Sequence, residues 1–523
     1  MQKIDPAFEI ERLLQFGRKH NMIGKWDVVP VRNALMALLQ VTEPYGGEVK
    51  GEIPDMPVTI LNHLLDYAAE AGILSENTVT YRDLLDAEIM GLLMPRQSEV
   101  IERFWRTAKE DGIEKATDDY YQLSKMSNYI RTDRIAKNLY WKTATEYGNM
   151  EITVNLSKPE KDPKAIAAAR AMKQTNYPKC LLCLENVGYP GRVNHPARQN
   201  HRVIPFALDG EQWFLQYSPY VYYNEHCIVF YEEHAPMKIW EKTFKRLLDF
   251  IEQFPHYFLG SNADLPIVGG SILSHDHFQG GHHRFAMELA AIEKVFYHSD
   301  YPAVGVGVVK WPMSVIRLSG QDKNRLTKMA VHILTRWRNY SDAEVGISAY
   351  TETGGEKVPH NTITPIARIN KDGLFELDLV LRNNRTSEEY PDGIFHPHEV
   401  LHHIKKENIG LIEVMGLAVL PGRLDTEIKR IEEILTGQTG YDELKIAKDE
   451  TLAKHLPWIR TMVKIYGTAV DKDRVRDILQ QEVGHIFTRV LEDAGVYKRD
   501  AGGQQAFTRF LNSAGFIEEN NAE

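Results

Sequence analysis

The spacing of hydrophobic positions predicts helices over the first part of the chain. One apolar stripe consists of Ile10, Leu13 and Leu14, and another of Ile60, Leu61, Leu64, Leu65 and Ala68. Residues three and four positions apart share one face of a helix, so each stripe marks a buried face. Histidines, cysteines and paired carboxylates do not gather here at a spacing typical of a site. We therefore predict a helical N-terminal region over residues 1–145 with a structural or oligomerisation role.

From Glu151 onward, short runs of β-branched and aromatic residues predict strands. Residues 203–208 and 213–223 flank the turn pair Asp209-Gly210, a combination typical of a β-hairpin. Residues 267–273 form a short apolar run, which predicts a buried strand. An amphipathic helical stripe lies between these segments, formed by Phe244, Leu247, Leu248 and Ile251.

The same ingredients recur in looser order further along the chain. Val315 and Ile316 indicate a strand, and the turn pair Asp372-Gly373 precedes a strand-like run over 374–381. A helical stripe lies between them, formed by Leu326, Met329, Ala330, Ile333 and Trp337. We therefore predict two similar α+β units at 146–310 and 311–425, although the match between the two is too weak to establish a duplication.

Helical periodicity returns after Pro421-Gly422 and predicts a helical C-terminal region over 426–523. Its main stripe is most simply a core face, formed by Val475, Ile478, Leu479, Val483, Ile486 and Phe487. Hairpins in the middle and helices at both ends predict the α+β class, with antiparallel sheets.

Composition and charge exclude several classes of protein. The chain has 523 residues, 43% of them hydrophobic and 26% charged, with a net charge of −10. This is a globular balance, and without a long basic tract a nucleic-acid-binding surface built on bulk charge is not expected. A small phosphorylated ligand needs only a few well-placed donors and stays possible.

The cysteine count and the apolar runs indicate the compartment. A disulfide-stabilised secreted protein normally has more than three cysteines, so a reducing environment is expected. The N-terminus lacks the pattern of a signal peptide, and no apolar run approaches the roughly 20 residues of a membrane span. We predict a cytoplasmic protein without a membrane partner.

The segment from Gly269 to His283 is the richest in chemistry. It contains Ser274-His275-Asp276-His277-Phe278-Gln279 between two pairs of glycines. If it continues as a strand, His275, His277 and Gln279 share a face. An imidazole can attack phosphorus and leave again because its pKa lies near neutrality, and glycines bring backbone N–H groups close to phosphate. The alternative is a surface cluster of histidines that binds metal adventitiously.

Cys180 and Cys183 supply two thiols from one turn, which is half of a tetrahedral zinc site. The chain has no second C-x-x-C pair, so a zinc ribbon is excluded and other ligands would be histidines. His234 and His275 are candidates. A redox-active pair or two ordinary buried thiols remain as alternatives.

The second predicted unit carries further donors. Arg382 and Arg385 could hold a phosphate through bidentate hydrogen bonds. This part of the chain is also rich in histidines, with His360, His396, His398, His402 and His403. Each taken singly is more simply a solvated or structural group.

These residues carry a family resemblance. The segment from Ser274 to Gln279 resembles the His-x-His-x-Gln motif of the galactose-1-phosphate uridylyltransferases, a branch of the histidine-triad superfamily. Residues 155–163, 216–227 and 360–368 resemble the longer, mainly Gram-positive type of that family, and the likeness covers nearly the whole chain. The resemblance implies two histidine-triad-like units and a two-step exchange of UMP between UDP-glucose and galactose 1-phosphate, in the Leloir pathway of galactose metabolism.

The resemblance also implies roles for single residues. His277 would be the nucleophile that becomes uridylylated, and Gln279 would hydrogen-bond the phosphate oxygens. Asn262 would contact the nucleotide. Apart from the resemblance, Ser271 in the glycine-rich lead-in and the phosphate-compatible Arg382 and Arg385 are further candidates for substrate binding. A structural zinc ion would be held by four side chains: Cys180, Cys183, His234 and His275. No organic cofactor and a homodimer are expected.

The match to the family is not uniform. The short type has prolines where this chain has Ser274 and Asp276. His396 and His398 resemble a second metal site of the short type, but its carboxylate ligand has no secure match, with Glu293 suggested only by spacing. Two other functions stay open: another histidine-triad reaction, such as that of a dinucleoside polyphosphate phosphorylase or hydrolase, and a non-catalytic zinc-stabilised binding protein.

Overall fold

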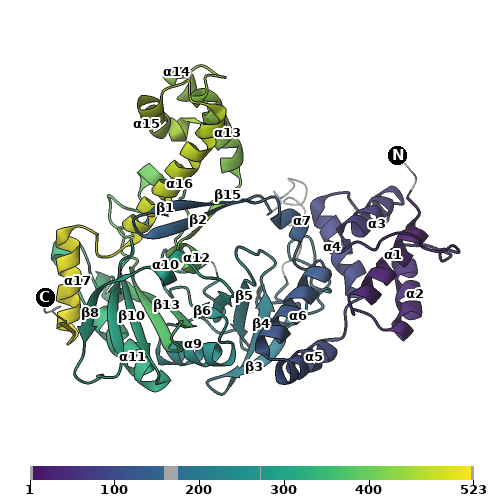
Figure 1. Cartoon of the computed structure of the whole chain (residues 1–523), viewed down its shortest axis with the longest axis horizontal. Coiled ribbons are helices and arrows are strands. Elements are labelled where there is room, and N and C mark those ends of the chain that lie inside the picture. The colour runs from purple at the N-terminus through teal and green to yellow at the C-terminus, as the bar shows by residue number, and fades with distance from the viewer. Residues whose placement is uncertain (1–3, 158–174, 271, 520–523) are drawn as a thin grey trace. The chain divides into compact units, whose positions relative to one another are not determined.

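The computed structural model describes residues 4–157, 175–270 and 272–519, drawn as ribbons in Figure 1. These residues form two compact units, and the chain passes between them several times. The first unit comprises residues 1–137, 157–236 and 274–277, and the second comprises 138–156, 237–273 and 278–523. The four-region division of the sequence therefore stays a prediction about sequence organisation.

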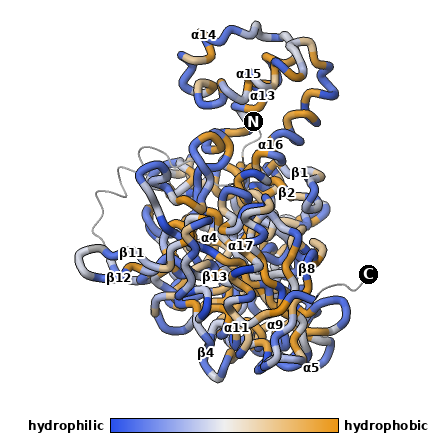
Figure 2. The backbone as a smooth tube through the Cα atoms, turned by 90° about the vertical axis from the view of Figure 1, so that its left-hand side faces the viewer, coloured by the Kyte–Doolittle hydropathy of each residue, from blue (hydrophilic) through white to orange (hydrophobic). Residues whose placement is uncertain are grey.

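The first unit begins with helices that share an apolar core. Both predicted stripes are buried, including Ile10, Leu13, Leu61 and Leu64, which are at most 1% exposed. Figure 2 colours the backbone by hydropathy, and hydrophilic blue and hydrophobic orange alternate along the chain. The helices are α1 (Pro6–Lys19), α2 (Val28–Leu38), α3 (Val58–Glu70), α4 (Val79–Gly91), α5 (Gln97–Glu110), α6 (Ile113–Met126) and α7 (Thr132–Ile135).

The first unit also contains the predicted hairpin. Strands β3 (Ile204–Leu208) and β4 (Glu211–Tyr217) pair antiparallel around Asp209 and Gly210, and β5 (Cys227–Tyr231) pairs with β4. Asp209 and Gly210 have φ angles of 50° and 75°, the left-handed backbone that a tight two-residue hairpin turn requires. The second strand ends at Tyr217, before the predicted limit.

The second unit is built on an antiparallel sheet in the order β16-β8-β9-β10-β14-β13-β6-β7. Its strands are β6 (Phe258–Gly260), β7 (His277–Gly281), β8 (Ile292–Tyr297), β9 (Gly305–Val309), β10 (Val315–Gly320), β13 (Asn361–Ile369), β14 (Phe375–Asn383) and β16 (Ile517–Glu518). Helices α9 (Glu241–Gln253) and α11 (Lys323–Arg338) pack on this sheet and on each other, which confirms both predicted helical stripes.

A second sheet of this unit has the order β1-β2-β15, with β2 and β15 parallel. It consists of β1 (Leu139–Thr145), β2 (Gly148–Asn155) and β15 (Leu417–Pro421), and β11 (Tyr350–Thr353) pairs separately with β12 (Glu356–Pro359). The remaining α-helices among the described residues are α10 (Ala286–Leu289), α12 (Leu411–Val414), α13 (Arg423–Leu435), α14 (Glu443–Ile446), α15 (Leu456–Tyr466), α16 (Lys472–Ala494) and α17 (Ala501–Ser513). The predicted α+β class with antiparallel sheets and helical ends is confirmed.

Two local predictions are wrong. Residues 139–145, inside the region predicted to be helical, form β1 because their aromatic and β-branched side chains favour a strand. The predicted strand over 267–273 is wrong for the residues described: residues 266–268 form a turn with Ile267 at a φ of 73°, and Gly269 makes a single bridge to Ala263. Pro266 before this segment and the two glycines at 269 and 270 within it favour a turn over a ladder.

Among the residues described, none of the helices combines the length and the apolar character that crossing a bilayer requires.

Candidate active site and metal cluster

His277 is the first residue of β7 and is only 6% exposed. Its Nδ1 lies 2.8 Å from the carbonyl oxygen of His275. Because a carbonyl oxygen can only accept, Nδ1 must carry the hydrogen, and the lone pair of the neutral ring lies on Nε2. Burial lowers the pKa of His277 to about 4, so the ring is neutral near pH 7. A neutral imidazole with its lone pair on Nε2 is the form that can act as a nucleophile.

Gln279 lies two residues further along β7, so its side chain and that of His277 leave the strand on the same face. Gly260 of β6 pairs opposite Gln279. The predicted pairing of an imidazole and an amide on one face is therefore present.

His275 does not belong to that face, and this part of the strand prediction is wrong. β7 begins only at His277, because the Asp276 N–H donates to the carbonyl of Ala235 and the Asp276 carbonyl accepts from the Tyr231 N–H. These bonds bend the chain before the strand starts. His275 donates from Nε2 to the Tyr231 carbonyl at 2.8 Å, which leaves the lone pair on Nδ1.

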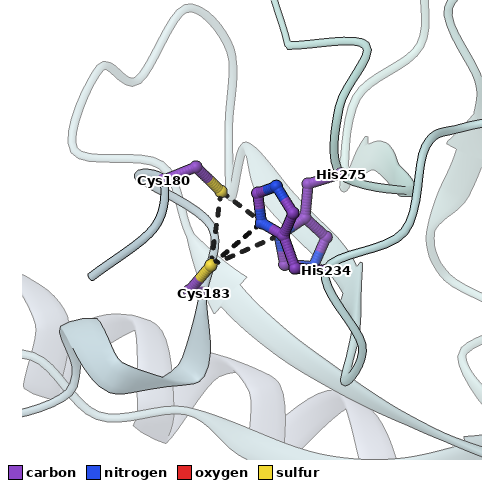
Figure 3. Close-up of side chains that lie close together, drawn as sticks. All are labelled: Cys180, Cys183, His234 and His275. Carbon is purple, nitrogen blue, oxygen red and sulfur yellow. Dashed lines mark hydrogen bonds between the residues drawn. The ribbon is translucent and has the colours of Figure 1, made fainter. Parts of the chain in front are cut away.

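That lone pair faces a cluster of two thiols and a second histidine, all in the first unit (Figure 3). Cys180 and Cys183 have their Sγ atoms 3.5 Å apart. His275 Nδ1 lies 3.2 Å from Cys180 Sγ and 3.7 Å from Cys183 Sγ, and His234 Nδ1 lies 3.2 Å from Cys183 Sγ. The four predicted metal ligands therefore lie together, within 4.8 Å of one another.

These distances fit a tetrahedral metal site. Zn–S bonds of about 2.3 Å and Zn–N bonds of about 2.05 Å place two sulfurs about 3.8 Å apart and a sulfur about 3.6 Å from a nitrogen. Burial and the neighbouring Cys180 raise the pKa of the Cys183 thiol to about 12, so this thiol keeps its proton unless a cation is present. The cluster can therefore hold a metal ion.

Asn186, which the sequence reasoning missed, supports the thiol turn. Its Nδ2 donates to the carbonyls of Cys180 and Cys183, both at 2.8 Å, and its Oδ1 lies 2.7 Å from Nε2 of His195. Nothing in the sequence distinguishes this asparagine from others, apart from its position three residues after Cys183.

The predicted substrate-binding residues that the structure describes all belong to the second unit. Asn262 is 5% exposed, and its Oδ1 accepts the Leu411 N–H at 2.9 Å. Ser271 lies outside the described residues, as do residues 158–163 of the family-like segment.

The two predicted phosphate-binding arginines reach backbone carbonyls. Arg382 is 1% exposed on β14, and its Nη2 donates to the Ile409 carbonyl at 3.0 Å. Its Nε has no hydrogen-bond partner among the described residues, and burial lowers the pKa of Arg382 to about 10. Arg385 follows β14 and donates from Nη2 to the Gly346 carbonyl.

A second metal site gains no support from Glu293, which makes two hydrogen bonds to Arg499 at 2.7 and 2.8 Å. His398 lies 3.5 Å from a carboxylate oxygen of Asp493. Three or more His, Cys, Asp or Glu side chains lie close enough to share a metal ion at one place in the described part of the chain, and that place is the Cys/His cluster.

Comparisons with known proteins match most of the chain. The family model for the N-terminal domain of galactose-1-phosphate uridyl transferase matches residues 11–236, and the model for its C-terminal domain matches residues 250–438. The galactose-1-phosphate uridylyltransferase of Caldanaerobacter subterraneus is 61% identical over 516 residues, which cover 99% of each chain. That of Bacillus subtilis is 54% identical over 512 residues, which cover 97% of each chain.

Among solved structures, a yeast Ap4A phosphorylase matches with a TM-score of 0.31 at 12% identity. The match covers 58% of this chain and 90% of the yeast chain, and it is too weak to carry a conclusion.

Proposed function

The chain belongs to the galactose-1-phosphate uridylyltransferase family, and we propose that it performs the family's reaction in two steps through a covalent intermediate on His277. It is a nucleotidyltransferase of galactose metabolism, which carries UMP from UDP-glucose to galactose 1-phosphate. Membership of this family sets aside a purely non-catalytic binding protein.

The observation that carries the two-step proposal is the hydrogen bond from His277 Nδ1 to the His275 carbonyl. It holds the ring in the tautomer with the lone pair on Nε2. As that lone pair forms a bond to phosphorus, the ring gains positive charge, and the Nδ1–H bond to a carbonyl stabilises it.

In the first step Nε2 of His277 attacks the α-phosphorus of UDP-glucose, and the bond from that phosphorus to the bridging oxygen breaks. Glucose 1-phosphate leaves with the bonding electrons, and UMP stays on the ring. In the second step a phosphate oxygen of galactose 1-phosphate attacks the same phosphorus and displaces the imidazole. Gln279, on the same face of β7, would donate to the non-bridging oxygens.

The remaining predicted contacts are part of the proposal. Asn262 would donate to the nucleotide from Nδ2, because its Oδ1 is already engaged with Leu411. Arg382 and Arg385 would offer guanidinium N–H groups to phosphate, and each has a buried Nε without a partner among the described residues. Ser271 is proposed from its place in the glycine-rich lead-in alone.

We propose zinc as the metal of the Cys/His cluster, in a structural role. Two thiolates and two imidazoles are a ligand set that zinc favours, and four protein ligands leave no open position for substrate. A reducing, cytoplasmic location fits free thiols at this site. A homodimer is proposed from the family resemblance.

Labelling tests the covalent step. The protein is incubated with uracil-labelled UDP-glucose alone, denatured, and assayed for retained label. We expect label in an acid-labile, base-stable linkage, as in a phosphoramidate, and release on addition of galactose 1-phosphate.

His277→Asn should retain no label and should lose at least about a thousandfold in transfer rate, with an unchanged unfolding midpoint. His485→Asn, at an exposed histidine of α16, is the matched control and should label like the parent. A parent enzyme that turns over without retaining label, or a His277→Asn variant that keeps full activity, would exclude the proposed step.

A further inference from the structure

The amide of Asn262 has one possible orientation, and the short helix α12 sets it. Leu411, the first residue of α12, donates its backbone N–H to Asn262 Oδ1 at 2.9 Å. A backbone N–H can only donate, so the oxygen of the amide must face Leu411 and Nδ2 must point elsewhere. An unrestrained asparagine could present either atom to a ligand. Here only the donor is offered.

The same helix start packs over the strand next to β7. A Cβ added to Gly260 would lie 2.8 Å from Leu411 Cδ1, so the Leu411 side chain rests on the glycine that pairs opposite Gln279. Asn262 follows Gly260 by two residues. Its Nδ2 faces Gly270, where an added Cβ would lie 2.6 Å away. Leu411 therefore makes two contacts near Asn262: its side chain packs on Gly260, and its backbone N–H binds the Asn262 amide.

The carboxylate of Glu413 binds Gly410, the residue just before α12, and a buried lysine. One carboxylate oxygen accepts the Gly410 N–H at 3.2 Å, and the other accepts from Lys405 Nζ at 2.9 Å. Lys405 also donates to the Val419 carbonyl of β15 at 3.0 Å. Glu413 is 9% exposed and Lys405 3%, so a buried ion pair joins the 410–411 turn to β15.

The Gly410 N–H would otherwise have no intrahelical partner, because the first N–H groups of a helix have none. Gly410 itself has no side chain that could fix the turn. The carboxylate of Glu413 therefore fixes the Ile409–Gly410 peptide, the unit directly before the Gly410–Leu411 peptide whose N–H binds Asn262.

We propose that Glu413 is a positioning residue for the uridylyl transfer. It acts through the Gly410–Leu411 backbone to keep Asn262 Nδ2 turned toward the phosphates of the nucleoside diphosphate. This inference rests on the proposed function, because it takes Asn262 as a nucleotide contact. Glu413 does not touch substrate in this proposal, but it decides whether Asn262 Nδ2 can contact the nucleotide.

Two double variants isolate the hydrogen bond from the buried charge. Lys405→Met with Glu413→Gln removes both charges and keeps a side-chain oxygen for the Gly410 N–H. Lys405→Met with Glu413→Leu removes the charges and that oxygen. Replacing both partners avoids an unpaired buried charge, which by itself would destabilise the fold. Unfolding midpoints of the two variants should agree within a few degrees.

We expect KM for UDP-glucose to rise roughly tenfold in the Leu-containing variant, because the hydrogen bond from Asn262 Nδ2 to a charged phosphate is lost. KM of the Gln-containing variant should stay near that of the parent. kcat should change less than KM in both. Asn262→Ala alone should match the Leu-containing variant. Combining Asn262→Ala with it should add no further effect, because both changes remove the same contact.

Equal KM values for the two double variants would overturn the proposal, and so would effects that add fully with Asn262→Ala. Labelling of His277 distinguishes a failure of the Glu413 positioning role from a failure of the covalent step. A positioning role that fails while the parent still retains UMP on His277 leaves the proposed function intact. A parent that retains no label removes the proposed function and this inference with it.

Discussion

His275 and His277 carry identical imidazole rings two positions apart, and one hydrogen bond to each ring decides which nitrogen keeps the lone pair. His275 donates from Nε2 to the Tyr231 carbonyl and keeps its lone pair on Nδ1, beside the thiols. His277 donates from Nδ1 to the His275 carbonyl and keeps its lone pair on Nε2. The two rings are thus held in opposite tautomers, which suits one for a metal and the other for phosphorus.

Gly270→Ala is expected to lower kcat/KM for UDP-glucose through the Asn262 amide. The new Cβ would lie 2.6 Å from Asn262 Nδ2, and a shift of the amide away from it would strain the hydrogen bond from the Leu411 N–H to Asn262 Oδ1. We expect kcat/KM for UDP-glucose to fall about tenfold, because a contact worth roughly 1.4 kcal/mol is lost.

Steady-state kinetics with UDP-glucose checks this expectation. Gly440→Ala is the control, since an added Cβ there meets nothing within 4 Å. Unchanged kinetics in Gly270→Ala would mean that the Asn262 amide is not held as described.

Among the elements, the loops beside β5 and β7 each contribute a histidine to the Cys/His cluster. Cys180 and Cys183 lie before β3, His234 follows β5 and His275 precedes β7. A metal ion bound by all four would cross-link three segments that the backbone alone connects only through long stretches of chain.

Cys180→Ser should therefore bind less metal and unfold at a lower temperature than the parent. Metal analysis of dialysed protein and a thermal melt measure the two effects. Cys227→Ala is the control, because Cys227 is a buried cysteine outside the cluster, and the metal content of this variant should equal that of the parent. Equal zinc in Cys180→Ser and the parent would remove the zinc proposal.

The β3–β4 hairpin offers a test of turn chemistry. Gly210 has a φ of 75°, and an added Cβ there meets nothing within 4 Å, so only backbone strain opposes a side chain. Gly210→Ala should lower the free energy of unfolding by roughly 1 kcal/mol.

Urea unfolding would measure that loss, with Gly46→Ala as control. An added Cβ at Gly46 also meets open space, and its φ lies outside the left-handed region. A loss of stability equal in both variants would show that the turn conformation is not the cause.

For the whole molecule, buried histidines predict instability in acid. His201 is 2% exposed, its Nε2 lies 2.8 Å from Gln216 Oε1, and burial lowers its pKa to about 3. The pKa of His195 is lowered to about 4, by burial and by the nearby Arg192 and Arg198.

Below pH 6.5 the unfolded chain protonates these rings while the folded chain keeps them neutral. Protons therefore favour the unfolded state, and stability falls as pH drops from about 6.5 toward 3. A fully buried ring contributes a loss of about 1.4 kcal/mol per pH unit in that window.

Urea midpoints at pH 7, 6 and 5 measure this dependence. His201→Gln should be less stable at pH 7 but should show a shallower decline, because one titrating group is gone. Parallel curves for the variant and the parent would exclude His201 as a cause.

The sequence by itself determined the features that depend on neighbours along the chain. Helical stripes, the Asp209-Gly210 hairpin and the C-x-x-C turn each follow from residues a few positions apart, and the structure contains all of them. The motif from His275 to Gln279 was recognisable for the same reason. Periodicity could not separate the two histidines, however, since alternation treats them alike.

Only the tertiary structure decided what depends on distant partners. The carbonyl of Tyr231 selects the tautomer of His275, and the Leu411 N–H selects the orientation of the Asn262 amide. Ile267 and Val268 are as apolar as strand residues but lie in a turn, and the neighbouring Gly269 makes only a single bridge to Ala263. Hydrogen-bond direction and strand pairing are set by backbone groups far away in sequence, which carry no signal in the residue pattern itself.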